Sequence, residues 1–274
     1  MFLDSFEEVD QWMLLLSRNG VKELILTNSS QCYKLPSNVF SCLELTKLKL
    51  ENCFFKPPDE FKGFVNLNDL DLQNIDFGAN LCGTEKPIED NVQVEKTTLP
   101  IMLSNLPKIV VLYLDGVFFK ALIEEKIPKW LPHPVNSLKR LFFLNFQLGD
   151  LDQLHGALCL LRNSPNLERL SVTSFQMRFR LIRYDLEPAS DHLEDPNCLD
   201  CTLDQLQTVE MTRLEGSKPE LLFIKLILAH SPSLLKFTIR PSKFSDVQKR
   251  LDIAKDVMQF PRASPKAKMF YLNP

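Results

Sequence analysis

The sequence predicts an α/β fold: a curved parallel sheet of about eight short strands, with helices and irregular loops on the convex side. An apolar pattern with the spacing L-x-x-L-x-L occurs eight times, and most of the intervals between copies are 22–29 residues. The copies begin at residues 21, 45, 67, 109, 138, 167, 206 and 234. One copy cannot bury its own leucines, whereas a stack can, so we expect a leucine-rich-repeat solenoid.

Each copy predicts one short strand. Its last two apolar residues stand two positions apart, as Leu24 and Leu26 do, and side chains at that spacing point to one face of a strand. Five of the seven intervals between copies fit the length of a leucine-rich repeat, about 20–29 residues. The two longer intervals, of 42 and 39 residues, each indicate one repeat plus an insertion.

We place the insertions at about residues 78–98 and 176–204. The first is polar, carries charges of both signs and is expected to be an exposed loop. In the second, the segment RFRLIRY alternates apolar and polar residues and could add a pair of strands. The segment PASDHLEDPNCLD that follows is acidic and rich in turn-forming residues, which predicts a loop.

Helices are predicted where apolar residues recur every three or four positions. Residues 4–20 form the first, opened by a capping box of Ser5 and Glu8. Its buried face is expected to hold Val9, Trp12, Met13 and Leu16. Another helix is expected around Leu154, Ala157, Leu158 and Leu161.

A third helix is predicted after Ser217, which forms a capping box with Glu220 and has Pro219 in the first turn. Its continuation, LLFIKLILAH, is apolar nearly all round and should be deeply buried. The Ser-Pro pairs at 164–165 and 231–232 should end helices and start strands, because proline cannot continue a helix.

The end of the chain predicts a cap for the last repeat. A capping box of Ser245 and Gln248 opens a helix there, and KMFYL at 268–272 predicts a closing strand. The buried face of this helix is expected to hold Val247, Leu251, Ala254 and Met258.

Composition excludes several classes of protein. The chain has 274 residues, a net charge of -3 and no block of lysine and arginine, so we expect neither nucleic acid nor membrane as a partner. The first residues do not form a signal peptide, and no uncharged apolar run approaches membrane-spanning length. Seven cysteines, an odd number, favour reduced thiols. We therefore expect a cytoplasmic or nuclear protein.

The C-terminal stretch allows a more specific comparison. Residues 203–272 contain a strand, a long apolar helix, a strand opened by Ser-Pro-Ser-Leu, and a final helix followed by FPRASP. Together with the repeats, this order resembles the plant F-box/FBD/LRR-repeat proteins. The resemblance implies irregular leucine-rich repeats over residues 1–198 and an FBD-like region over residues 199–274 that continues and caps them.

The chain departs from that family in two respects. An F-box usually precedes the repeats and docks the adaptor of a cullin-RING ubiquitin ligase, but the roughly twenty residues before the first predicted strand do not resemble one. We therefore expect a ubiquitin-ligase adaptor as partner only if an F-box exists upstream. The ninth repeat position, often asparagine or cysteine, fits only at Cys53, so no asparagine ladder is expected.

The sequence offers little chemistry. Cys198 and Cys201 have the spacing of half a zinc site, but no second pair of ligands stands at a standard distance. The nucleotide-binding, hydrolase and metalloprotease motifs are absent, and the four histidines are scattered. We therefore expect no catalytic residue, no metal and no cofactor, and we predict that the chain is not an enzyme.

The informative surface is the strand face opposite the leucines, which becomes the concave face of the predicted sheet. Neighbouring strands lie about 4.8 Å apart, so equivalent positions form columns across that face. An apolar and aromatic island between charged positions has the composition of a binding hot spot. The predicted partner-binding residues are Val111, Tyr113, Phe142 and Leu144, with Lys49 and Asp71 beside them. Alternatively, the 78–98 insertion or the proline-rich loop KIPKWLPHPV covers the island as private core.

These observations predict a protein-interaction module that resembles the substrate-recognition region of an F-box-type receptor of a cullin-RING ubiquitin ligase, with a protein target as partner. A second reading is a scaffold or decoy that has the same surface and no ligase output. A third is a small-ligand receptor in which the island and the insertion enclose an apolar molecule.

Overall fold

The computed structural model describes residues 7–28, 32–58, 60–76, 102–103, 105–116, 128–175 and 186–274. The predicted insertion at 78–98 lies outside these residues. The chain forms two compact units, Met1–Glu125 and Lys126–Pro274, and each is described by itself. The predicted boundary between residues 198 and 199 falls inside the second unit and remains a prediction.

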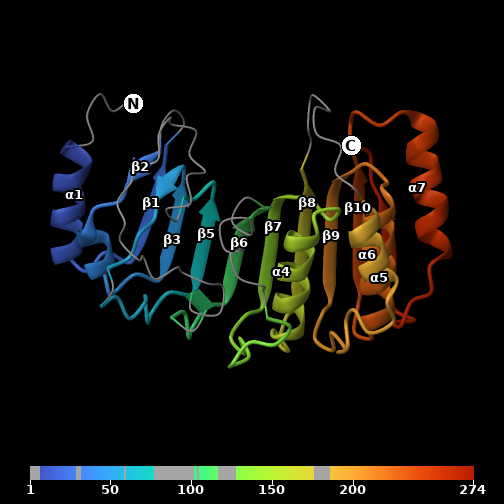
Figure 1. Cartoon of the computed structure of the whole chain (residues 1–274), viewed down its shortest axis with the longest axis horizontal. Coiled ribbons are helices and arrows are strands. Elements are labelled where there is room, and N and C mark those ends of the chain that lie inside the picture. Colours follow the sequence, from blue (N-terminus) through green and yellow to red (C-terminus); the bar gives the residue numbers. More distant parts are fainter. Residues whose placement is uncertain are drawn as a thin grey trace. The chain divides into compact units, whose positions relative to one another are not determined.

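The first unit contains parallel strands in the order β1, β3, β5, β6 (Figure 1). They span Glu23–Thr27, Lys47–Glu51, Asp69–Gln73 and Val111–Asp115. Its described residues also form helix α1 (Glu7–Arg18), the short parallel pair β2 (Tyr33–Lys34) and β4 (Cys53–Phe54), and the 3-10 helix η1 (Ser37–Ser41).

The leucines of the repeat pattern are in register across the first unit. Leu24, Leu48, Leu70 and Leu112 are aligned partners, as are Leu26, Leu50, Leu72 and Leu114. All of these except the half-exposed Leu26 are buried. This alignment confirms the predicted strands, because each leucine packs on its equivalent in the neighbouring strand and is removed from water there.

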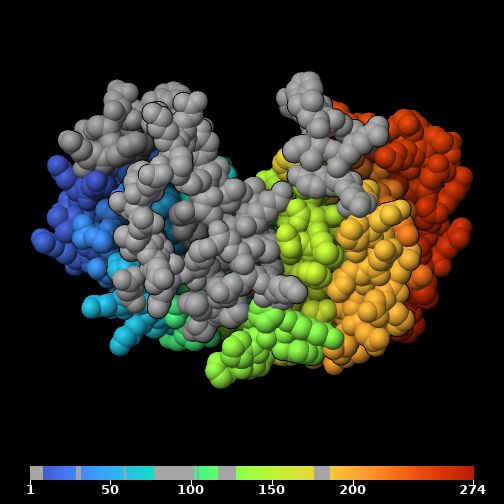
Figure 2. Space-filling model, viewed as in Figure 1, coloured from blue at the N-terminus to red at the C-terminus, as the bar shows by residue number. Residues whose placement is uncertain are grey.

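Among its described residues, the second unit has five parallel strands in the order β7, β8, β9, β10, β11. They span Arg140–Phe146, Arg169–Ser174, Thr208–Leu214, Lys236–Pro241 and Lys268–Tyr271. The helices are α4 (Leu151–Arg162), α5 (Glu187–Glu194), α6 (Lys218–His230) and α7 (Val247–Gln259). Helices α4, α5 and α6 lie on one side of the strands (Figure 1), and their atoms cover that side in the space-filling view (Figure 2).

Both predicted buried helices of this unit are confirmed. In α4, residues Leu154, Ala157 and Leu158 are fully buried, and Ser164 follows the helix end. In α6, the side chain of Glu220 accepts a hydrogen bond from the Ser217 backbone at 2.9 Å and one from the Ser174 hydroxyl at 2.8 Å. The second bond ties the start of α6 to the end of strand β8.

The predicted closing strand is also confirmed. Strand β11 pairs in parallel with β10, with Lys236 opposite Lys268 and Thr238 opposite Phe270. Tyr271 donates a hydrogen bond from its hydroxyl to the backbone oxygen of Arg250 in α7, at 2.6 Å. The last repeat strand therefore has a hydrogen-bonded neighbour on its far edge.

Two predicted helix faces need correction. In α1, Val9 and Met13 are buried as expected, but Trp12 is 49% exposed. In α7, the predicted face is wrong: Val247, Leu251 and Met258 are exposed, and the buried residues are Ile253 and Val257. The helix has apolar residues on both sides, so periodicity alone does not show which side packs on α6. Its N-cap is Asp246, whose carboxylate accepts from the Lys249 amide at 2.7 Å.

The loop predicted for PASDHLEDPNCLD is wrong, because most of this segment is helix α5. Pro188 stands in the first turn, where its missing N–H costs nothing, and Ala189 and Leu193 are buried one turn apart. These two residues pack where α5 meets α4 and α6. The predicted strand pair in RFRLIRY lies outside the described residues.

The expectation that no asparagine ladder exists is also wrong for the first unit. Asn28, Asn52 and Asn74 directly follow strands β1, β3 and β5. The side chain of Asn52 donates to the Asn28 backbone oxygen, and the side chain of Asn74 donates to the Asn52 side-chain oxygen. Asn52 and Asn74 have φ angles of 55° and 48°, a region that asparagine tolerates better than most residues. The ladder stands at the eighth repeat position rather than the ninth.

Candidate functional site

The candidate site is the strand face opposite the buried leucines. In the first unit, its central column runs through four aligned residues: Ile25, Lys49, Asp71 and Tyr113. Lys49 Nζ lies 2.9 Å from an oxygen of Asp71, and this hydrogen bond raises the pKa of the lysine despite partial burial. Two residues earlier in the same two strands, and on the same face, Lys47 and Asp69 form a longer ion pair of 3.7 Å.

Not all of the predicted partner-binding residues of this unit are exposed to solvent. Tyr113 and Lys49 are partly exposed, whereas Val111 is 4% exposed and Asp71 is 8% exposed. The expectation of an accessible Val111 therefore needs correction, and Asp71 acts mainly as the partner of Lys49. Tyr113 is the predicted aromatic residue of the first unit that can reach a partner.

In the second unit, the central column runs through five aligned residues: Phe142, Ser171, Glu210, Thr238 and Phe270. Phe142 and Leu144 are partly exposed, and the guanidinium of Arg169 stands 5.8 Å from the Phe142 ring centre. Cation–aromatic contact of this kind is common at binding surfaces. The predicted island is thus divided between the two units, with Val111 and Tyr113 in the first and Phe142 and Leu144 in the second.

A column of cations that the sequence analysis missed lies beside Phe142. It occupies the first position of each strand in the second unit and runs through Arg140, Arg169, Thr208, Lys236 and Lys268. All of these except the half-exposed Thr208 are exposed. The available signal in the sequence is a basic residue directly before the apolar pair of four predicted strands.

One acidic residue stands among these cations. Glu210 lies 3.4 Å from a guanidinium nitrogen of Arg169 and 3.7 Å from one of Arg240. Thr212 and Thr173 continue the surface with a hydrogen bond of 3.1 Å between their hydroxyls. The two arginines offset the charge of Glu210, so this face keeps a positive character along its basic column.

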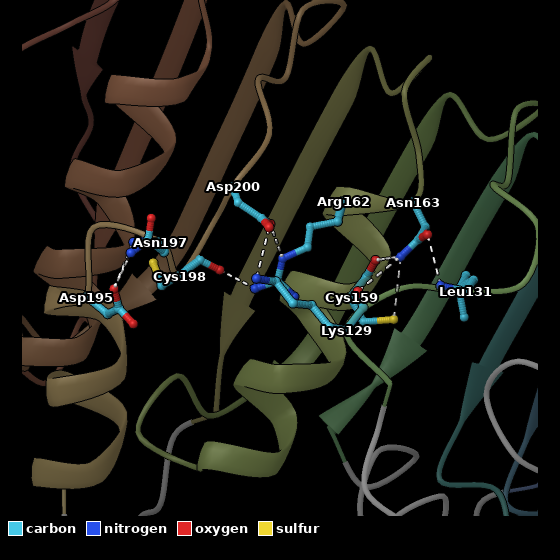
Figure 3. Close-up of polar contacts among 9 residues, drawn as sticks. All are labelled: Lys129, Leu131, Cys159, Arg162, Asn163, Asp195, Asn197, Cys198 and Asp200. Carbon is cyan, nitrogen blue, oxygen red and sulfur yellow. Dashed lines mark hydrogen bonds and ion pairs between the residues drawn. The ribbon is translucent and has the colours of Figure 1, made fainter.

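The proline-rich loop has described contacts at the end of α4. The Leu131 amide donates to the Asn163 side chain at 3.0 Å (Figure 3). The Val135 amide donates to the Asn163 backbone at 2.7 Å. Leu131 and Val135 are both buried. These contacts fix the described part of the loop against the end of α4.

A second polar cluster joins that loop to the segment after α5 (Figure 3). Asp200 lies 3.2 Å from the guanidinium of the nearly buried Arg162 and 2.9 Å from Lys129 Nζ. The Lys129 contact is the main cause that lowers the pKa of Asp200. Arg162 also donates to the backbone oxygen of Cys198. Each charge has a partner of opposite sign, so the cluster has the arrangement of ion pairs that hold segments of the fold together.

The cysteines near this cluster are poor metal ligands. Burial raises the pKa of the Cys198 and Cys201 thiols, and it raises the pKa of Cys159 to about 11. A thiol must lose its proton to bind a metal, so a raised pKa opposes binding at neutral pH. Within residues 7–28, 32–58, 60–76, 102–103, 105–116, 128–175 and 186–274, no group of three or more His, Cys, Asp or Glu residues could hold a metal ion.

Two family models match separate segments of the chain, and a curated relative matches nearly all of it. The family model described as "FBD-associated F-box protein At5g56370, LRR repeats" matches residues 9–80, and the model described as "FBD" matches residues 196–239. The chain is 27% identical to the F-box/FBD/LRR-repeat protein At1g13570 of Arabidopsis thaliana, over 97% of this chain and 76% of that protein. These matches support a plant F-box/FBD/LRR-repeat family protein.

A second F-box protein is also similar to the chain. The putative FBD-associated F-box protein At5g50270 of Arabidopsis thaliana is 25% identical over 86% of this chain, which spans 57% of that relative's length. Similarity to these F-box/FBD/LRR-repeat proteins indicates a protein-interaction role. Among the helices that the structure describes, none has the length and apolar character needed to cross a membrane.

The two matched segments correspond to well-defined parts of the fold. The LRR match extends from within α1 to just past β5 and includes the asparagine ladder. The FBD match covers β9, α6 and most of β10, and it ends at residue 239, before α7 and β11. Two of the exposed cations, Arg140 and Arg169, therefore precede the FBD match, and Lys236 lies within it.

Proposed function

We propose that this chain is the substrate-recognition region of an F-box-type receptor of a cullin-RING ubiquitin ligase, and that the strand face binds the protein target. The observation that carries the proposal is the difference between the two faces of the strands. In the second unit, helices α4, α5 and α6 cover the leucine face, whereas the opposite face presents the partly exposed Phe142 and Leu144. Contact with the ligase adaptor belongs, in this proposal, to an F-box, a module after which both Arabidopsis relatives are named.

We also propose that each unit is built as a leucine-rich-repeat solenoid and that β11 and α7 serve as an FBD-type cap. The in-register leucines support the first part, because each strand repeats the packing of its neighbour. The hydrogen bond of Tyr271 to α7 and the pairing of β11 with β10 support the second.

Target capture by variants of the full chain tests the proposal. Alanine at both Tyr113 and Phe142 removes one aromatic anchor from each unit, and proteins bound to wild type and variant in plant extract would be compared by quantitative mass spectrometry. We expect the variant to lose a defined set of partners while its melting temperature changes little, because both side chains are partly exposed. The matched control is alanine at Trp130 and Phe244, which are 51% and 61% exposed and lie outside the strand columns.

Two outcomes would contradict the proposal. If the Tyr113 and Phe142 variant is strongly destabilised, these rings belong to a private core and not to a docking surface. If the control variant loses the same partners, capture does not depend on the strand face. Recovery of the ligase adaptor with the chain separates a ligase receptor from a scaffold or decoy with the same surface.

A further inference from the structure

We propose that the strand face of the second unit binds an extended acidic segment of a protein, with carboxylate side chains along the basic column and apolar side chains on Phe142 and Phe270. This inference rests on the proposed function and names the class of target segment that the face fits. Four exposed cations, Arg140, Arg169, Lys236 and Lys268, stand at equivalent positions of four strands. Parallel register aligns them along one line across the sheet.

The basic column is specific to this unit. The equivalent column of the first unit contains Glu23, Lys47, Asp69 and Val111, and its lysine is paired with Asp69 at 3.7 Å. That column is mixed in charge, whereas the column of the second unit has four cations and one threonine. A negatively charged chain would therefore be attracted to the strand starts of the second unit and not to those of the first.

The aromatic residues limit the length of the segment. Phe142 on β7 and Phe270 on β11 stand at the two ends of the central column, and Phe270 is 39% exposed. Five strands at the usual spacing place the two rings about 19 Å apart. An extended chain covers that distance with about six residues. Lys236 Nζ lies 5.2 Å from the Phe270 ring centre, so a cation and an aromatic ring are adjacent at this end.

The charge of the whole molecule favours a short protein segment over nucleic acid or an anionic membrane. The chain carries a net charge of -3, which repels a long polyanion that extends beyond the basic column. Glu210, whose charge Arg169 and Arg240 offset, still places a carboxylate inside the face. A segment that alternates or mixes carboxylates with apolar residues can avoid Glu210, whereas a uniform phosphate backbone cannot.

A labelled peptide tests the inference with the full chain. The probe is a fluorescein-labelled peptide of about six residues, with glutamates between two terminal phenylalanines, and binding is followed by fluorescence anisotropy at low ionic strength. We expect saturable binding that weakens as salt is added, because exposed ion pairs are screened. A peptide with glutamine in place of glutamate should bind much more weakly.

Charge reversal locates the site. Lys236→Glu combined with Lys268→Glu should weaken peptide binding about tenfold, since two attractive contacts become repulsive. The matched control is Lys225→Glu combined with Lys255→Glu, which changes the net charge equally at exposed positions of α6 and α7 and should change binding less than about twofold. Phe270→Ala should also weaken binding, with the unfolding transition of each variant measured in parallel.

Several results would overturn the inference. Absence of saturable peptide binding, an equal loss in the control variant, or tighter binding of a single-stranded oligonucleotide or of vesicles containing phosphatidylserine would each do so. The outcome is separate from that of the proposed function. If target capture still depends on Tyr113 and Phe142 while the peptide fails to bind, only the acidic chemistry is wrong, whereas loss of that dependence contradicts the docking surface itself.

Discussion

The eighth residue of the repeat controls the turn after three strands of the first unit. Asn52 has a positive φ angle of 55°, donates to the backbone of Asn28 and accepts a hydrogen bond from Asn74. Alanine can make none of these side-chain bonds and adopts positive φ at a cost of about 1–2 kcal/mol. Glycine adopts positive φ freely but also lacks the side-chain bonds. Alanine and glycine substitutions therefore separate the cost of the positive φ angle from the loss of the side-chain hydrogen bonds.

We predict that Asn52→Ala lowers the free energy of unfolding by about 2 kcal/mol and that Asn52→Gly lowers it by about 1 kcal/mol. Urea denaturation followed by circular dichroism measures both. Asn66→Ala is the control: it removes two exposed side-chain bonds, one donated to the Leu43 backbone and one accepted from Lys108, and it should have a smaller effect because no positive φ is involved. Equal losses for alanine and glycine would mean that backbone conformation at this position contributes nothing.

Two histidines between α4 and α5 should make stability depend on pH. The rings of His155 and His192 meet edge to face at 4.7 Å, and burial lowers the pKa of both. For His155, the charge of His192 lowers the pKa further, whereas the charge of Asp152 raises it. For His192, the charge of Arg162 lowers the pKa further, whereas the charge of Asp195 raises it. Below the ordinary histidine pKa, about 6.5, the unfolded chain binds protons that the folded chain resists. Acidification therefore removes stability.

We predict that the melting temperature of the wild type falls between pH 7.5 and pH 5.5 and that His155→Gln combined with His192→Gln reduces this fall. The buried carboxyl of Glu220, whose pKa is raised by burial, contributes a change of the opposite sign, but it is present in both proteins. His133→Gln, at an exposed position, serves as the control. An unchanged pH dependence in the double variant would contradict the role of the pair.

At the scale of elements, short sequence signals correctly predicted the helices and strands whose position depends on interactions within a few residues. The capping box at Ser217, the proline that follows each buried helix and the alternation in each strand act within a few residues, and the corresponding elements are where the sequence places them. Helix α5 was missed because its stability comes from the contacts of Ala189 and Leu193 with other helices. The buried face of α7 was misassigned for the same reason.

Gly216 determines how closely α7 can approach the turn before α6. It has a φ angle of 72°, and a Cβ atom built there would lie 2.5 Å from Ile253 Cγ1. We predict that Gly216→Ala destabilises the protein by about 2–3 kcal/mol, through both backbone strain and the displacement of Ile253. Gly20→Ala separates the two causes, because Gly20 has a φ angle of 61° but its Cβ would meet nothing closer than Glu44 Cγ at 3.8 Å.

Denaturant unfolding of the two variants gives the comparison. The loss for Gly20→Ala should reflect the backbone term alone and stay near 1 kcal/mol. If Gly216→Ala is no more destabilising than Gly20→Ala, the turn moves freely away from Ile253, and the proximity of α7 is not a constraint.

At the scale of the whole molecule, the repeat period predicted the strand register and hence the columns of the candidate site. Ile25, Lys49, Asp71 and Tyr113 are aligned as expected, and so are Phe142, Ser171, Glu210 and Thr238. Burial within a column could not be predicted, since Val111 and Thr238 are covered by neighbours that a repeat pattern does not specify. The basic column required a comparison of the first strand position across repeats, because each cation alone reads as an ordinary solvated charge.

The same packing predicts unequal protection of the strands against hydrogen exchange. Strands β8, β9 and β10 lie between neighbours on both sides and carry fully buried residues such as Leu170, Val209 and Phe237. They also share a unit with α4 and α6, whose apolar side chains are largely buried. Strand β1 ends the strand order of the first unit, and its Ile25 is 56% exposed while Leu26 is half-exposed.

We therefore predict that amides of β8, β9 and β10 exchange slowest in the full chain and that amides of β1 exchange at least about tenfold faster. Exchange would be followed by mass spectrometry at several pH values, to verify that opening is in rapid equilibrium with closing. Helices provide an internal control, since amides of the buried α6 should outlast those of α7, whose outer face is exposed. Equal protection of β1 and β9 would mean that local opening is governed by a single cooperative transition and not by how completely each strand is covered.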